Sequence, residues 1–478
     1  MNFNSVEFLI FLPVVLVFYW GIPHKFRWMV LLAASYYFYM CWNFRLAGLI
    51  FGTTAISYLA AILVEEKPKY KKLWLVLTLV VCLGVLAWFK YFTFFANSIL
   101  SVVNRLAQKN YRLDMDILLP VGISFYTFQT LSYVIDVYRG DFPAERHFGY
   151  YALFVSYFPQ LVAGPIESAE NLLPQLREEH RMNCTDAKMG INLLLSGFFR
   201  KCVVADTCGI YVNRMFASAD TANAPAIFLG GALFCVQMYC DFGGYSEIAM
   251  GAARLMGVKL MRNFDRPYLS QSYGEFFRRW HISLNRWFTS YLYIPLGGSR
   301  RGKWRRVCNT VIVFALCGLW HGANWTYVLW GLYAAMFVSL EGVFLKPALK
   351  AIEAGGVDTH GGAFRLLRQC MMFVIYIPAA LLFRSGSVSQ AIGLVGGLFT
   401  RGGGLADAFE TLEMTGPDVL RVGMILVCTY LIYPLTLEES ERDPLPLSGY
   451  VYGVLLVGCC VFALLATQGN ADFAYFQF

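Results

Sequence analysis

Long apolar runs separated by short polar stretches dominate the chain. About a dozen runs have cores of roughly 12–21 residues, close to the ~20 that cross hydrocarbon as a helix. Examples are Phe8–Ile22, Trp28–Trp42, Leu46–Leu63, Leu73–Phe89, Thr310–Trp330, Val422–Tyr433 and Val451–Leu465. A spanning segment must satisfy its own backbone polar groups, so these runs are predicted to be helices. The pattern predicts an all-α, polytopic integral membrane protein of about a dozen helices.

Composition and charge refine this picture. The 478 residues are 58% hydrophobic and 15% charged, whereas a soluble domain is about 25% charged. No basic segment precedes Phe8–Ile22, which is predicted to be the first permanent span rather than a cleavable signal. The positive-inside rule then places the N-terminus outside. Simple alternation would leave the basic residues after Arg254 outside as well, so either an element between Gly190 and Met250 is re-entrant or broken, or one span is miscounted.

Positive charge gathers between Arg254 and Arg306. This basic block holds twelve Lys and Arg residues against two acidic ones, and its charge exceeds the net +8 of the whole chain. An ordinary positive-inside anchor has this character. The block equally suits anionic lipid headgroups, or an anionic substrate such as coenzyme A. Arg279 is therefore a candidate substrate-binding residue. Membrane lipids are expected partners, and nucleic acid is not.

An amphipathic helix is predicted over Ser272–Tyr291 within the basic block. Ser272 and Glu275 have the spacing of a capping box, which marks a helix start. Aromatic residues and leucine then recur every three or four positions and form one apolar stripe. Such a helix suits the membrane interface, and His281 points with its apolar face.

Two of the six histidines are the leading functional candidates. His321 directly follows the apolar run Val311–Trp320, and an ionisable side chain at membrane depth indicates a functional site. Imidazole is the side chain best suited to proton transfer near neutral pH. A structural histidine that hydrogen-bonds between helices is the alternative for His321. A packing role is the alternative for His281.

Further polar residues within apolar segments are candidates for substrate binding or for lining a channel. Asp241 and Glu247 flank glycines in a helix segment that is predicted to be broken, and an ion pair with an arginine of the basic block is the alternative. Gln129 either lines a channel or hydrogen-bonds between helices. Asn324 lies three residues after His321, close to the same predicted helix face, where it orients the imidazole or makes an interhelical contact.

Two other features bear on the site. Trp320 packs around His321 or stacks on substrate. No spacing of His, Cys and carboxylate residues is typical of a metal site, so no metal and no bound cofactor are predicted.

Several motifs occur in the order found in one known family. They are Leu119–Gln129, Ser132–Gly140, Phe158–Ile166, Tyr239–Ala249, Arg279–Leu284 and Trp320–Gly322. Together they resemble the membrane-bound O-acyltransferase (MBOAT) family. Tyr291–Gly298 and the terminal Phe473–Phe478 are similar to its bacterial alginate O-acetyltransferase branch. The resemblance covers essentially the whole chain and implies one MBOAT domain over residues 1–478. Gly243 and Glu247 depart from the family pattern, in which serine and aspartate are common.

The resemblance implies a helix bundle around a central channel in the bacterial plasma membrane. His321 would be essential and would act as the general base of acyl transfer, and His281 would often be required. The donor would be cytoplasmic acetyl-CoA. The acetyl group would reach hydroxyls of an exopolysaccharide, commonly through an extracytoplasmic acetyltransferase or SGNH-hydrolase-like partner protein.

Three alternatives stay open. D-alanyl transfer to teichoic acid would use a carrier-protein thioester as donor. Acylation of a lipid would show as a preference for long-chain acyl-CoA. A non-enzymatic polymer or solute transporter would tolerate substitution of both histidines, and its flux would depend on Asp241 or Glu247.

Overall fold

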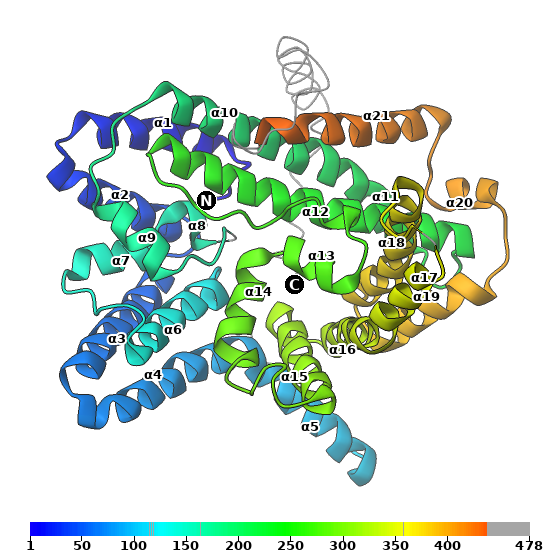
Figure 1. Cartoon of the computed structure of the whole chain (residues 1–478), viewed down its shortest axis with the longest axis horizontal. Helices are drawn as coiled ribbons and strands as arrows, with labels where there is room; N and C mark the ends of the chain where they lie inside the picture. The colour runs from blue at the N-terminus through cyan, green and yellow to red at the C-terminus, as the bar shows by residue number, and fades with distance from the viewer. Residues whose placement is uncertain (114, 116, 118, 163, 357, 437–478) are drawn as a thin grey trace. The chain divides into compact units, whose positions relative to one another are not determined.

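The computed structural model describes residues 1–113, 115, 117, 119–162, 164–356 and 358–436. Every regular element in these ranges is a helix, which confirms the all-α prediction. The expected span Val451–Leu465 and the terminal motif Phe473–Phe478 lie outside the described residues. The chain folds into two compact units. Figure 1 shows the helices of the chain, coloured by residue number.

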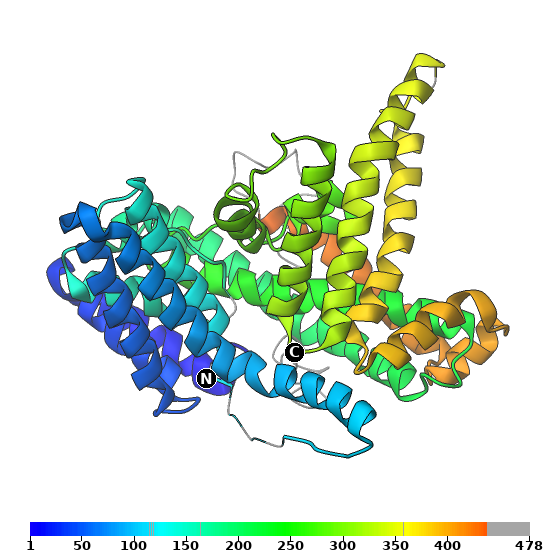
Figure 2. The ribbon, with the colours of Figure 1, turned by 90° about the horizontal axis from the view of Figure 1, so that it is seen from below.

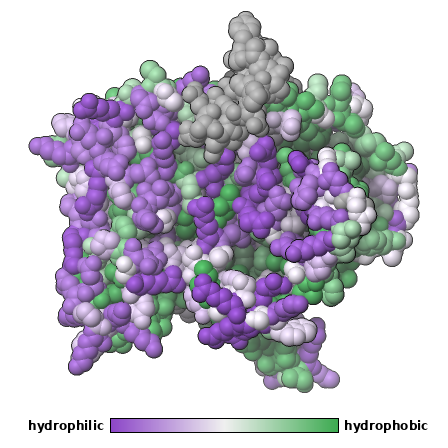
Figure 3. All heavy atoms as spheres, in the orientation of Figure 1, coloured by the Kyte–Doolittle hydropathy of each residue, from purple (hydrophilic) through white to green (hydrophobic). Residues whose placement is uncertain are grey.

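Unit 1 comprises Met1–Ile191 and Ala249–Met261. Its helices α3 (Leu46–Glu66), α4 (Lys71–Leu86) and α6 (Ile123–Arg139) pack side by side. Its other α-helices are α1 (Val6–Gly21), α2 (His24–Met40), α5 (Phe92–Ala107), α7 (Phe148–Ser156), α8 (Phe158–Leu161) and α9 (Ala169–Arg177). Helix α5 exposes Ile99, Val102 and Leu106, and hydrophobic residues are visible along it in Figure 3. Exposed apolar side chains of this kind suit contact with lipid.

Unit 2 comprises Asn192–Ile248 and Arg262–Phe478. Two helices are shared with unit 1, α10 (Cys184–Phe198) and α12 (Ala224–Leu255). Its other helices include the π-helix η3 (Phe199–Ala205), α11 (Asp206–Ala217), α13 (Tyr273–Arg279), α14 (Ile282–Phe288), the π-helix η5 (Thr289–Tyr293), α15 (Lys303–His321), α16 (Trp325–Leu340), α17 (Lys346–Ala354), α18 (Gly362–Arg384), α19 (Val388–Thr400), α20 (Leu405–Thr411) and α21 (Gly416–Ile432).

Five helical segments in the described ranges are long and apolar enough to cross a membrane. They are Leu46–Glu66, Pro68–Ala107, Ala224–Leu255, Trp325–Ala354 and Gly362–Arg384, and the bent pair α20–α21 would make a sixth. A multi-pass membrane protein is therefore confirmed. Some predicted runs form helices shorter than a span, such as the 16-residue α1, and Thr310–Trp330 is divided by a turn.

The predicted break at Gly243 and Gly244 is wrong, because α12 runs through both glycines as one 32-residue helix. The irregular segment nearby is instead η3, the π-helix between α10 and α11. Glycine is needed here for close approach rather than for bending. A Cβ atom on Gly244 would lie 2.7 Å from the carbonyl oxygen of Gly197 in α10.

Helices α15 and α16 form a tight hairpin where a single span was predicted. A Cβ atom on Gly318 would lie 2.1 Å from the carbonyl oxygen of Tyr327, and one on Gly331 would lie 2.1 Å from that of Phe314. The two helices can pack this closely only because both positions lack a side chain. Their connection follows His321 directly, so the hairpin turn fixes the place of this histidine.

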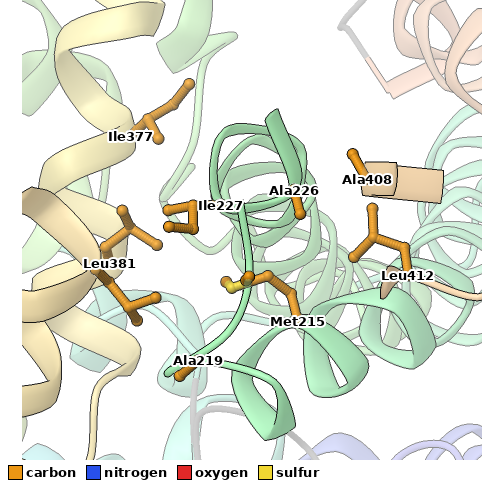
Figure 4. Close-up of a cluster of buried hydrophobic side chains, with 10 residues drawn as sticks. Met215, Ala219, Ala226, Ile227, Ile377, Leu381, Ala408 and Leu412 are labelled. Carbon is orange, nitrogen blue, oxygen red and sulfur yellow. The ribbon is translucent and has the colours of Figure 1, made fainter. Parts of the chain in front are cut away.

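A hydrophobic cluster holds α12 against α18 in unit 2. Ile227 of α12 packs near Ile377 and Leu381 of α18, while Met215 of α11 and Leu412 extend the cluster (Figure 4). Figure 2 shows α16 and α18 running alongside each other. Helices α12, α16 and α18 supply most of the side chains around His321, so this packing positions the site.

Candidate functional site

His321 is the last residue of α15 and is buried, with 8% of its surface exposed. Its ring lies 5.2 Å from that of Trp330 in α16 and 5.2 Å from that of Phe383 in α18, centroid to centroid. Both contacts are edge-to-face, the arrangement that aromatic rings prefer. Three helices therefore hold this imidazole in an aromatic environment.

His281 lies between two short helices rather than within a long one. The single helix predicted over Ser272–Tyr291 is wrong: α13 ends at Arg279, and α14 begins at Ile282. His281 has a left-handed backbone with φ of 45°, which is uncommon for a residue other than glycine and interrupts the helix. The predicted start is confirmed, since the Ser272 hydroxyl accepts a hydrogen bond from the Glu275 amide.

Two asparagines stabilise the break at His281, and neither was predicted from the sequence. The Asn285 side-chain amide donates hydrogen bonds to the carbonyls of Phe277, Trp280 and His281 at 2.7, 2.6 and 3.2 Å. The backbone carbonyl of Asn263 accepts a hydrogen bond from the backbone amide of Ile282 at 3.0 Å. The only signal for Asn285 was its position as a polar residue in the predicted helix.

The His281 ring is almost fully buried, with 1% of the residue exposed. It packs edge-to-face against Phe242 at 4.8 Å and against Trp320 at 5.8 Å. His281 lies outside the five candidate spans. Burial among uncharged rings lowers the pKa of His281 to about 3. The ring is therefore neutral at physiological pH.

Trp320 connects the two histidines. Its ring contacts His281 at 5.8 Å and the adjacent His321 at 4.9 Å. The indole is buried. The structure thus brings together three of the residues selected from the sequence, His281, Trp320 and His321.

A cavity of about 60 Å³ lies beside His321. Its lining is aromatic apart from Cys235, Met238, Ala379 and Ala380, and the aromatic members besides His321 are Phe234, Phe242, Tyr268, Tyr273, Phe276, Phe277, Trp280, Trp330, Tyr376 and Phe383. Apolar walls with few polar groups are typical of ligand pockets. The sequence pattern placed these residues only in apolar stripes or spans, because spacing does not show which side chains meet around a cavity.

Asp241 and Glu247 form buried ion pairs. Lys201 Nζ lies 2.9 Å from Asp241, and Arg200 Nη1 lies 2.8 Å from Glu247. The Ser196 hydroxyl also donates to Glu247 at 2.9 Å. The cations of these two ion pairs come from η3, and Arg262 of the basic block also attracts the Glu247 carboxylate. Arg200 and Lys201 lie inside an apolar run of the sequence, and this position indicates that both side chains are buried.

Asn324 caps a helix and does not share a helix face with His321. Helix α15 ends at His321, and Asn324 is the N-cap of α16, where its side chain accepts from the Thr326 amide at 3.1 Å. It also donates to the Gly386 carbonyl at 3.0 Å. The shared face inferred from a three-residue spacing fails because the chain turns at Gly322.

Two other candidates are held by local partners. Arg279 pairs with Glu275 at 2.9 Å and with Asp265 at 3.7 Å. Gln129 belongs to unit 1, where its side chain donates to the Phe154 carbonyl at 2.8 Å. This contact matches the interhelical alternative for Gln129.

The chain is similar to known acyltransferases along most of its length. The model of the membrane-bound O-acyltransferase family matches residues 143–377. A probable alginate O-acetylase of Pseudomonas putida is 35% identical over 93% of this chain and 89% of its own length. A peptidoglycan O-acetyltransferase of Helicobacter pylori is 31% identical over 78% of this chain and 73% of its own length. A teichoic acid D-alanyltransferase of Bacillus subtilis is 27% identical over 47% of this chain and 60% of its own length. The chain therefore belongs to the membrane-bound O-acyltransferase family, and it is a multi-pass membrane acyltransferase.

Proposed function

We propose that this protein moves acetyl groups from cytoplasmic acetyl-CoA to hydroxyls of an extracytoplasmic polysaccharide. The observation that carries the proposal is the position of His321, a buried imidazole beside a small aromatic cavity. Its ring contacts Trp320, and the same indole contacts the buried ring of His281. The named activities of the alginate and peptidoglycan relatives support an acetyl group and a polysaccharide acceptor. Both compact units would serve one acyltransferase domain in the bacterial plasma membrane.

His321 acts as the general base in this proposal. It takes the proton of the acceptor hydroxyl as the oxygen attacks the thioester carbonyl carbon. The new C–O bond forms, the C–S bond breaks, and His321 returns the proton to the departing sulfur, so that coenzyme A leaves as its thiol. General-base catalysis of this kind contributes typically about 10²–10⁴-fold to the rate. The aromatic walls exclude water, which protects the thioester from hydrolysis.

His281 supports the reaction as a neutral residue that orients substrate or packs against Trp320. Asp241 and Glu247 contribute through their ion pairs, which hold α12 against η3. An extracytoplasmic acetyltransferase or SGNH-hydrolase-like partner completes transfer to the polymer. In this proposal the site receives its donor from the cytoplasm and delivers the acetyl group toward an acceptor outside the cell.

The experiment is donor turnover by purified protein reconstituted in lipid vesicles. Radiolabelled acetyl-CoA is supplied, and release of labelled acetyl or its transfer to an added polysaccharide is measured. Wild type is compared with His321→Ala and with His360→Ala, a matched control at an exposed histidine. We expect turnover by wild type and by His360→Ala, and a loss of at least about 100-fold in His321→Ala.

Two outcomes would overturn the proposal. Full turnover by His321→Ala would exclude this base. Turnover only when a D-alanyl carrier-protein thioester replaces acetyl-CoA would identify the protein as a D-alanyltransferase. A transporter would instead move solute in the His321→Ala variant and lose flux when Asp241 or Glu247 is neutralised.

A further inference from the structure

The cavity beside His321 is small. Its volume is about 60 Å³, whereas an apolar cavity of about 150 Å³ holds benzene, with six heavy atoms. By this comparison about 60 Å³ accommodates two or three heavy atoms. An acetyl group has three heavy atoms, so the space matches a short acyl group.

Aromatic contacts close the cavity at Phe276. Its ring centroid lies 3.9 Å from that of Tyr376 in α18 and 5.3 Å from that of Trp280, against which it stacks. Phe276 and Tyr376 both line the cavity and are buried. Because the two rings come from different helices and are already in contact, a longer chain has no room between them.

Small residues create the space that remains. Ala379 and Ala380 also line the cavity and lie between Tyr376 and Phe383 on α18. Larger side chains at these two positions would occupy the volume that an acetyl group needs. The size of the cavity therefore depends on alanine from one helix and on Phe276 from another.

Two tyrosines contribute their rings to the cavity wall. The hydroxyl oxygens of Tyr273 and Tyr376 are buried, and neither has a hydrogen-bond partner among the described residues. Both residues line the cavity, and their rings are 4.6 Å apart. Because these hydroxyl oxygens are not exposed to the cavity, the two residues present their rings to a ligand.

We infer that this cavity binds the acyl group of the donor thioester, and that Phe276 together with Tyr376 restricts the enzyme to short acyl chains. The inference rests on the proposed function and adds its donor specificity. The methyl group of the acyl chain lies against the aromatic walls. When the acceptor oxygen attacks, the C–S bond breaks and the acyl group leaves with the acceptor.

The test is a chain-length profile. We measure kcat/KM with acetyl-, butyryl- and hexanoyl-CoA for reconstituted wild type, Phe276→Ala and Phe276→Leu. One methylene that does not fit a pocket typically changes kcat/KM by about 10–200-fold. We expect wild type to use acetyl-CoA at least about 10-fold better than butyryl-CoA. Phe276→Ala raises the butyryl-to-acetyl ratio at least about 10-fold, and Phe276→Leu gives an intermediate ratio.

The ratio compares two donors in one sample, so partial unfolding of a variant does not alter it. Phe373→Ala is the matched control, because Phe373 packs against Tyr268 in the same cluster but does not line the cavity. We expect its butyryl-to-acetyl ratio to equal that of wild type. An unchanged ratio in Phe276→Ala, with normal acetyl transfer by wild type, would overturn this inference alone. A wild type that uses none of the acyl-CoA donors would overturn the proposed function as well.

Discussion

His281 packs edge-to-face against Trp320, with 5.8 Å between ring centroids. Trp320 also contacts the ring of His321, at 4.9 Å. The two histidines come from separate motifs and are linked through one buried indole. The position of each imidazole therefore depends on the packing of Trp320.

Replacing Trp320 should affect both the fold and the reaction. Trp320→Ala leaves a cavity between the two imidazoles and should lower the free energy of unfolding by about 3–5 kcal/mol. The rate of acetyl transfer per folded molecule should also fall, because His321 loses a neighbour that fixes its ring. Thermal unfolding in detergent and donor turnover in vesicles measure the two effects. Trp325→Ala is the control: Trp325 is 49% exposed, and surface changes usually stay within about 0.5 kcal/mol.

Adjacent glycines in α12 should respond differently to alanine. A Cβ atom on Gly244 would lie 2.7 Å from the Gly197 carbonyl oxygen and 3.0 Å from the Lys201 amide nitrogen. These are backbone atoms, so α10 must shift, and Gly244→Ala should destabilise the protein by about 1–3 kcal/mol. At Gly243 the nearest atom would be 3.5 Å away, in the Tyr239 ring. Equal melting temperatures for the two alanine variants would contradict the close approach of α10 and α12.

The stability of the protein should depend on the ion pair of Arg200 with Glu247, because this pair is buried. Glu247→Gln leaves a guanidinium that is 2% exposed without its carboxylate, and breaking a buried pair costs about 3–5 kcal/mol. The double variant Arg200→Met, Glu247→Leu should recover much of that loss, because neither charge remains. The exposed pair of Arg214 with Glu413 supplies the control, and Glu413→Gln should change unfolding by at most about 1 kcal/mol. Thermal unfolding of all three variants measures these differences in stability. A double variant less stable than Glu247→Gln would argue that the unpaired buried charge is not the cause of the loss.

The buried His281 should make stability depend on acid pH. Its pKa is about 3 in the folded protein and about 6.5 in the unfolded chain. Above pH 6.5 both forms are neutral. As the pH falls below 6.5 the unfolded histidine takes up a proton and the folded one does not, so unfolding becomes easier. The linkage amounts to about 2 kcal/mol at pH 5.

The His281→Asn variant isolates this contribution. Asparagine tolerates the left-handed backbone of this position, but it does not titrate. The stability difference between pH 7.5 and pH 5 should therefore be smaller in the variant than in wild type by about 2 kcal/mol. Identical pH profiles of unfolding would mean that His281 is protonated equally in both states.

Local pattern correctly predicted that His321 is buried. His321 was selected because an ionisable residue follows an apolar run, and the structure buries it beside a cavity. The same reasoning failed for Asn324, since a three-residue spacing implies a shared face only while one helix continues. The turn after His321 makes Asn324 the N-cap of the next helix. The pattern also did not reveal that η3 supplies the cations of the ion pairs with Asp241 and Glu247, because it does not record which helix packs against α12.

The sequence by itself determined the all-α class, the membrane location and the family, because apolar run length, low charge and ordered motifs are properties of the chain alone. Tertiary structure decided that the helix breaks at His281, that α15 and α16 fold back on each other, and that Phe276 meets Tyr376. These features depend on contacts between distant segments, such as the hydrogen bond from Ile282 to Asn263 and the close packing at Gly318. Periodicity records which face of a helix is apolar, but it does not record which other helix covers that face.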